Sequence, residues 1–150
     1  PVVGHIGLTP PSGPALGGSK AQGRTAATAN RLVADALALQ EAGCYSLVLE
    51  AVPTPVAARI TETLTIPTIG IGAGPNCDGQ VLVYHDLLGL TQGHTARFVK
   101  RYADLATIIR EALAAFVADV RSGAYPEERH TYGMPAEEQA TFEAAIAEKP

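Results

Sequence analysis

Short apolar runs alternate with longer segments of helical periodicity along this chain. The runs of strand length are residues 2–7, 46–50, 68–71 and 81–84. Helices are predicted at residues 25–42, from Thr54 onward, at residues 96–121 and at residues 136–148. The first of these helices places Leu32, Ala36 and Leu39 three to four positions apart, which is the spacing of one helix face. Strands that alternate with helices predict a parallel sheet built from βα units.

The strand segments consist of consecutive apolar residues, a pattern that predicts a sheet covered on both faces. Four βα units fit either a small doubly wound sheet or half of a (β/α)8 barrel, because a whole barrel needs about 250 residues. Both architectures place their functional residues at the carboxyl ends of the strands. The side chains at these ends are therefore the candidates for chemistry.

Two of the strand ends carry a side chain suited to proton transfer or substrate binding. Glu50 closes the run Ser-Leu-Val-Leu-Glu, and His5 lies in Gly-His-Ile-Gly at the end of the first run. A carboxylate is seldom buried without a partner, so Glu50 either accepts backbone N–H bonds from the next helix or acts as a general base. His5 is either a structural hydrogen-bonding residue or a ligand-binding one.

The other strand ends favour structural roles. The glycines of Gly-Ile-Gly-Ala-Gly-Pro at residues 70–75 are not followed directly by a helix, which a phosphate-binding loop requires. His85 and Asp86 are adjacent, so on a strand they would point to opposite faces, and Asp86 is expected to bond the following loop. The histidines and cysteines lack zinc-binding spacing, and Cys44 is at the wrong end of its strand for a nucleophile.

Composition narrows the class of protein further. Apolar residues make up 47% of the 150 residues, enough for one compact core. The net charge of −4, without a basic run, argues against a nucleic-acid partner. No apolar stretch has the length of a membrane span or the form of a signal peptide, and two cysteines are read as reduced thiols of a cytoplasmic protein. The chain begins with Pro1 in an apolar run and is interpreted as a fragment.

A series of sequence blocks resembles one enzyme family. The blocks are GHIGLTPPS, GGSKAQGRT, LVLEAVP, IPTIGIGAGPNCDGQVLVYHDLLGL, ARFVKRYADL and SGAYPEERHTY. In order and spacing they are similar to the C-terminal half of ketopantoate hydroxymethyltransferases. The resemblance covers residues 1–132 and leaves residues 133–150 as a polar, helical tail. It implies strands five to eight of a TIM-type (β/α)8 barrel.

The resemblance also implies a reaction. Members of that family transfer a hydroxymethyl group from 5,10-methylenetetrahydrofolate to 3-methyl-2-oxobutanoate, giving 2-dehydropantoate, in the pathway to pantothenate. It implies that Glu50 is the base that removes the C3 proton and that His5 binds the keto acid. The family's Mg²⁺ ligands lie on its first four strands, so none is assigned to this chain.

Several features depart from the family pattern. Pro11, Ser19 and Thr131-Tyr132 replace the usual residues at peripheral positions, where tuning rather than loss of function is expected. Half a barrel leaves open sheet edges, which predicts pairing with an N-terminal half or with further copies of the chain. Two alternatives stay open at this point, namely an inactive half-barrel and a small doubly wound module that binds phosphate.

Overall fold

The computed structural model describes residues 1–9 and 20–147 of the chain. Pro11 and Ser19 lie outside the described residues. Contacts divide the chain into two compact units, Pro1–Ala106 and Thr107–Pro150. This division does not coincide with the boundary expected at residue 132, and the separate C-terminal tail stays a prediction.

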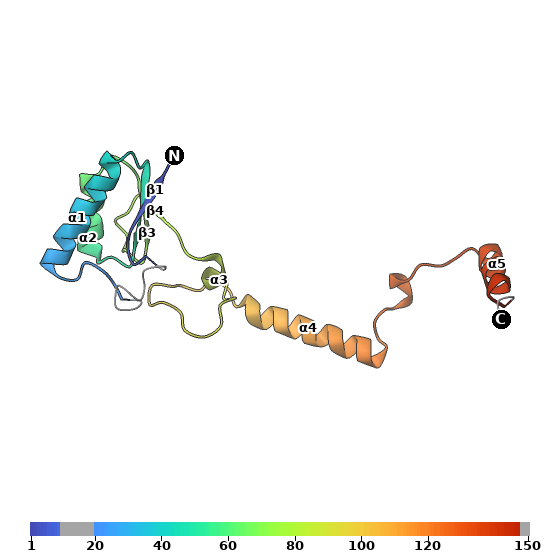
Figure 1. Cartoon of the computed structure of the whole chain (residues 1–150). Helices are drawn as coiled ribbons and strands as arrows, with labels where there is room; N and C mark the ends of the chain where they lie inside the picture. Colours follow the sequence, from blue (N-terminus) through green and yellow to red (C-terminus); the bar gives the residue numbers. More distant parts are fainter. Residues whose placement is uncertain (10–19, 148–150) are drawn as a thin grey trace. The chain divides into compact units, whose positions relative to one another are not determined.

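The first unit contains a four-stranded sheet whose strands are all parallel (Figure 1). The strands are β1 (Val3–Gly7), β2 (Ser46–Glu50), β3 (Thr68–Ile71) and β4 (Gly79–Gln80). Their order across the sheet is the same as their order along the chain, β1-β2-β3-β4. The α/β class predicted from the sequence is confirmed.

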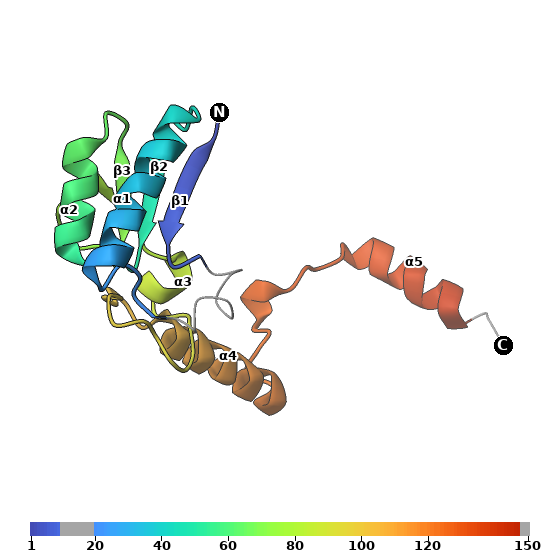
Figure 2. The same cartoon turned by 60° about the vertical axis from the view of Figure 1, so that its left-hand side comes forward.

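Two helices cover one face of this sheet, α1 (Ala26–Glu41) and α2 (Thr54–Thr63) (Figures 1 and 2). The start of α1 is fixed by a capping box, in which Thr25 accepts a hydrogen bond from the Thr28 backbone N–H. A doubly wound sheet reverses its strand order so that helices lie on both faces. The sequential order and the shared helix face therefore argue against the doubly wound alternative and are typical of part of a (β/α)8 barrel.

The core lies between the sheet and these two helices. Its fully buried members include Leu47 and Leu49 of β2 and Ile60 of α2, with no exposed surface, and Ala36 of α1 packs against them. Leu32 and Leu39 of the predicted α1 stripe are partly buried against the same cluster. The stripe read from the sequence is thus the face of α1 that packs on the sheet.

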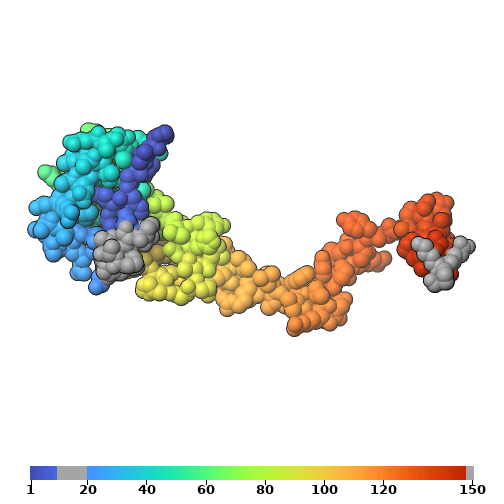
Figure 3. All heavy atoms as spheres, in the orientation of Figure 1, coloured from blue at the N-terminus to red at the C-terminus, as the bar shows by residue number. Residues whose placement is uncertain are grey.

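The opposite face of the sheet is open, which corrects the prediction of a sheet covered on both faces. Along β1 exposed and buried residues alternate, with Val3 45% exposed and Ile6 buried. The dark blue atoms of β1 lie at the surface of this unit (Figure 3). The side chains on this open face are mostly apolar. The strands therefore do not show the alternation of apolar and polar residues that is usual when one face of a sheet is exposed. Val48 and Ile69 on this face are only partly buried, whereas Ile71, beside Glu50, is buried.

The fourth strand is shorter and earlier than predicted. Pairing with β3 ends after Val81, whose N–H donates to the Gly70 carbonyl at 3.0 Å. Tyr84, expected to finish that strand, instead begins the short helix α3 (Tyr84–Leu87), in which the Leu87 N–H donates to the Val83 carbonyl at 2.9 Å. The strand predicted at residues 81–84 is therefore wrong.

The long helix predicted from residue 96 is also corrected. Helix α4 (Leu105–Ser122) begins nine residues later. The backbone N–H groups of Tyr102 and Leu105 donate to the carbonyls of Leu87 and Leu88, at 2.9 and 3.0 Å. These bonds hold the segment before α4 against α3. The backbone N–H group of Tyr102 is therefore bonded to Leu87 and is not available for a hydrogen bond within the predicted helix. Phe98, inside the helix predicted at residues 96–121, consequently belongs to a loop.

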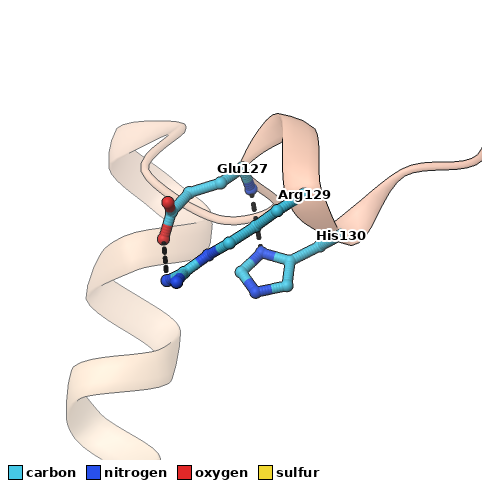
Figure 4. A network of polar contacts seen from close by, with 3 residues as sticks. All are labelled: Glu127, Arg129 and His130. Atoms are coloured by element: carbon cyan, nitrogen blue, oxygen red, sulfur yellow. Dashed lines mark hydrogen bonds and ion pairs between the residues drawn. The ribbon is translucent and has the colours of Figure 1, made fainter.

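The second unit, which contains all of α4 (Leu105–Ser122) after Ala106, has little buried surface. No residue of α4 is buried, and its apolar stripe, including Ile109, Leu113 and Phe116, is exposed. The 3₁₀ turn η2 (Glu128–His130) follows, with a capping contact from the Glu127 N–H to His130 Nδ1 and an ion pair from Arg129 to Glu127 (Figure 4). Helix α5 (Ala136–Ala147) is exposed throughout. In the parts of the chain that are described, no helix combines the length and hydropathy needed to cross a bilayer.

A small polar network joins the start of β3 to the segment before β4. Asp78 Oδ2 accepts from the Thr68 backbone N–H at 2.7 Å and from its hydroxyl at 3.0 Å. The backbone N–H bond, followed by the hydroxyl bond, lowers the pKa of Asp78 below its usual range. Burial raises the pKa of the neighbouring Cys77 thiol, although bonds from Thr61 and Thr68 oppose this. Cys77 is therefore a thiol rather than a thiolate at neutral pH.

Replacing Asp78 with alanine is expected to lower the free energy of unfolding by about 1 kcal/mol at pH 7, because it removes the acceptor of a buried N–H group. The lowered pKa means that this contribution is present above the ordinary aspartate pKa and is lost as the pH falls through the folded-state value. Urea unfolding at pH 7 and at pH 3 measures the change. The control is Glu62→Ala on α2, whose side chain is 69% exposed. Equal losses for both variants at pH 7 would contradict the assigned role of Asp78.

Candidate active site

The parallel register of β1 and β2 brings His5 and Glu50 to the same face of the sheet. His5 is paired with Val48, and Gly7 is paired with Glu50. On the neighbouring strand, His5 therefore lies beside the residue that is two positions before Glu50. Side chains two positions apart on a strand share a face. This is the face that α1 and α2 leave open. Two residues far apart in sequence therefore meet at the carboxyl end of the sheet.

The two side chains are in direct contact. His5 Nε2 lies 3.1 Å from Glu50 Oε2, within hydrogen-bonding distance. The Glu50 side chain is 15% exposed, whereas that of His5 is 37% exposed. A half-buried carboxylate at the end of an apolar strand is thus accommodated by a hydrogen bond to an imidazole. Because a carboxylate has several lone pairs, Glu50 keeps the capacity to accept a proton.

The backbone around Glu50 is fixed on both sides. Its carbonyl accepts from the Leu8 N–H at 2.8 Å, immediately beyond the end of β1. Gly7, at φ 94°, allows this approach, because a Cβ at that position would collide with the Glu50 carbonyl oxygen. A larger residue at Gly7 would push the two strand ends apart. The close approach of the two backbones is what holds His5 and Glu50 on adjoining strands.

The residue after Glu50 has an unusual conformation. Ala51 has a φ of 50°, the left-handed region that residues with a Cβ seldom adopt. Its N–H donates to the Ile71 carbonyl and its carbonyl accepts from the Gln22 N–H, both at 2.9 Å. These two bonds hold the turn that ends β2. Such local strain is found preferentially where a structure must present a particular side chain, here Glu50.

The remaining sequence candidates do not join this pair. Asp86 lies on α3, not on a strand, and its Oδ1 accepts from the Thr91 hydroxyl at 2.6 Å, as expected for a loop-bonding role. The segment after Gly74 continues through turns into β4, without the helix that a phosphate loop needs. Cys44 is buried in the core and unpaired. Within residues 1–9 and 20–147, no cluster of three His, Cys, Asp or Glu side chains is placed to hold a metal ion.

The described residues therefore do not form a metal centre by themselves. His5 and Glu50 are the only candidate ligands that the described strand ends bring together, and two ligands bonded to each other leave few donors for Mg²⁺.

The fold and the paired side chains define an α/β protein with a proton-accepting group at the carboxyl end of a parallel sheet. Comparison with known sequences gives its family. The profile of the family described as ketopantoate hydroxymethyltransferase matches residues 1–128. The chain belongs to this family, whose members are transferases.

Named relatives are consistent with this assignment. The chain is 58% identical over 147 residues to the 3-methyl-2-oxobutanoate hydroxymethyltransferase of Nitratidesulfovibrio vulgaris, covering 98% of this chain and 47% of that protein. It is 55% identical to the enzyme of the same name from Oleidesulfovibrio alaskensis, covering 98% and 51%. For Citrifermentans bemidjiense the identity is 58%, covering 88% and 49%. The chain spans about half the length of the relatives that it matches.

Sequence reasoning found the two residues but not their contact. It assigned His5 to the keto acid and Glu50 to catalysis separately, whereas the register places one against the other. It also gave no role to His94 and Arg97, which line a cavity beside this site. His94 lies just before the helix predicted from residue 96 and Arg97 lies inside it, so the late start of α4 at Leu105 had to be known before either could be placed on a loop.

Proposed function

We propose that this chain is the C-terminal half of a (β/α)8 hydroxymethyltransferase and that β1 to β4 correspond to strands five to eight of the barrel. The family match, the length relative to the named enzymes and the sequential parallel strand order support this. The proposed reaction joins 3-methyl-2-oxobutanoate, water and 5,10-methylenetetrahydrofolate to give 2-dehydropantoate and tetrahydrofolate. The observation that carries the proposal is the contact between His5 and Glu50 at the strand ends.

Glu50 is the proposed general base. The C3 proton of the keto acid passes to the Glu50 carboxylate, which leaves an enolate. The one-carbon unit then forms one bond to the enolate carbon and one to the oxygen of water, while both of its bonds to the folate nitrogens N5 and N10 break. The two nitrogens take up the two protons released, one from C3 through Glu50 and one from water. His5 holds Glu50 through its Nε2, and its exposed ring faces the space where the keto acid would bind. Two roles are thus combined in His5, positioning of the base and contact with the substrate.

The open face of the sheet supports the proposal that this chain needs a second polypeptide segment to complete the barrel. Val3, Val48 and Ile69 lie on the same face as Glu50, and none of them is fully buried. In a closed barrel these side chains would form interior layers with residues of the other strands. We propose that the partner is an N-terminal half carrying the Mg²⁺ ligands, within an assembly of several copies. Mg²⁺ bound there would stabilise the developing enolate oxygen.

Proton exchange at C3 of 3-methyl-2-oxobutanoate tests this proposal. The protein would be a chimera in which the part of the Nitratidesulfovibrio vulgaris enzyme that this chain lacks is joined in front of residue 1. Exchange is followed by NMR in deuterated water with Mg²⁺ and without folate. We expect exchange by the chimera and none by the 150-residue chain alone. A folded chimera that neither exchanges the proton nor forms product with methylenetetrahydrofolate would refute the proposed function.

A further inference from the structure

A cavity of about 820 Å³ lies at the carboxyl ends of β2 and β3. Its wall includes Ala51 and Gly72, the residues that directly follow these strands, and Thr54 at the start of α2. The loop that precedes α4 closes the other side with His94, Arg97 and Phe98. This volume is within the range of about 300–1,000 Å³ found for sites of drug-sized ligands. All lining residues belong to the first compact unit.

The lining combines an apolar wall with cationic groups at its rim. Arg97 is exposed, and among the described residues it has no hydrogen-bond or ion-pair partner. His94, another lining residue, is also exposed, and none of the described residues that line the cavity is an aspartate or a glutamate. Phe98 contributes an aromatic ring that packs directly on the backbone of Gly72. A ligand that matches these features has an extended ring system and at least one carboxylate or other anionic group.

The cavity adjoins the proposed base without including it. Ala51 forms part of the wall, and the residue before it is Glu50, but neither Glu50 nor His5 is a lining residue. The chain therefore places the proposed base next to a separate cavity that lies between Ala51 and Arg97. A reaction of two substrates requires this arrangement, since the reacting carbon of the second substrate must reach the carbon that Glu50 deprotonates.

We propose that this cavity binds the reduced folate, with its ring system against Phe98 and its glutamate carboxylates at Arg97. This inference rests on the proposed function, because that function supplies the identity of the second substrate. Arg97 is suited to the role because a guanidinium binds a carboxylate through two parallel N–H bonds. The one-carbon unit then lies at the Ala51 side of the cavity, next to Glu50.

The test is direct binding of 5-formyltetrahydrofolate, a stable reduced folate, to the 150-residue chain, measured by calorimetry. Arg97→Gln is expected to weaken binding about tenfold, the lower end of what loss of a hydrogen bond to a charged group costs. Arg59→Gln is the matched control, because Arg59 is an exposed arginine of α2 that lines none of the cavity. It should leave the dissociation constant unchanged.

A second ligand separates the carboxylate contact from general effects on the cavity. When both glutamate carboxylates are converted to amides, the affinity for the unmodified chain should fall, and Arg97→Gln should no longer change it. Phe98→Ala should weaken binding of both ligands. Absence of saturable binding, or equal effects of Arg97→Gln and Arg59→Gln, would overturn the assignment. Since proton exchange by the chimera needs no folate, exchange without folate binding would refute this site alone, and the reverse result would refute the proposed base alone.

Discussion

Replacing Glu50 with glutamine in the chimera is expected to lower the rate of C3 proton exchange by at least about 100-fold, the contribution typical of a positioned general base. The amide has nearly the same shape and can still contact His5, whose Nε2 lies 3.1 Å from the native carboxylate. It has no site that accepts a proton at neutral pH. The loss would therefore report the chemistry of the carboxylate rather than its packing. Exchange rates from NMR at saturating keto acid measure the effect.

The matched control for this result is Glu62→Gln. Glu62 is a glutamate of the same unit, but its side chain is 69% exposed and only 3.8 Å from Arg59 in a loose surface pair. The control should exchange the proton at the unmodified rate. His5→Ala should give a smaller loss than Glu50→Gln, because the base remains while its position becomes less defined. Undiminished exchange in a folded Glu50→Gln chimera would show that another group is the base.

Replacing Leu49 with alanine should lower the free energy of unfolding by about 2–5 kcal/mol, the range for truncating a fully buried leucine. Leu49 has no exposed surface and belongs to the cluster between the sheet, α1 and α2. Domains of this size are stable by only about 5–15 kcal/mol, so the variant should be strongly destabilised. Urea unfolding of the 150-residue chain, followed by circular dichroism, measures the loss. The loss of packing should also affect the candidate active site, since Leu49 immediately precedes Glu50.

Val48→Ala is the control for the opposite face of β2. Val48 lies between Leu47 and Leu49 in the strand but is only partly buried. Its truncation should cost less than about 1 kcal/mol in the isolated chain, because part of the side chain already contacts water. In the chimera the same change should cost more, as the open face becomes covered. A larger loss for Val48→Ala than for Leu49→Ala in the isolated chain would contradict the assignment of the core to the helix-covered face.

The sequence predicts the elements that local patterns determine. The α1 stripe and the apolar run of β2 are examples, because the periodicity of each is contained within its own segment. The segment from Val81 to Tyr102 was not predicted correctly. There the apolar residues fit a strand or a helix equally well, and the outcome depends on backbone bonds to residues distant in sequence, such as Tyr102 to Leu87.

The candidate site likewise has features that the sequence predicts and features that depend on contacts between distant segments. Glu50 and His5 are recognisable because a polar side chain at the end of an apolar strand is unusual, and the family resemblance supports both. Their contact depends on the pairing of β1 with β2, for which a single sequence has no local signal. The positive φ of Ala51 also depends on bonds to Gln22 and Ile71 from other segments. The uncovered sheet face could not be read from strands whose apolar runs are typical of fully buried ones.

A crystal structure of the chimera with 3-methyl-2-oxobutanoate bound would test the role of Glu50 most directly. The distance that matters joins the C3 carbon of the keto acid to the nearer carboxylate oxygen of Glu50. We expect it to be about 3–3.5 Å, the separation of reacting atoms in a near-attack arrangement, with His5 still bonded to Glu50. A keto acid bound with C3 facing another basic side chain, and with Glu50 out of reach, would contradict Glu50 as the base.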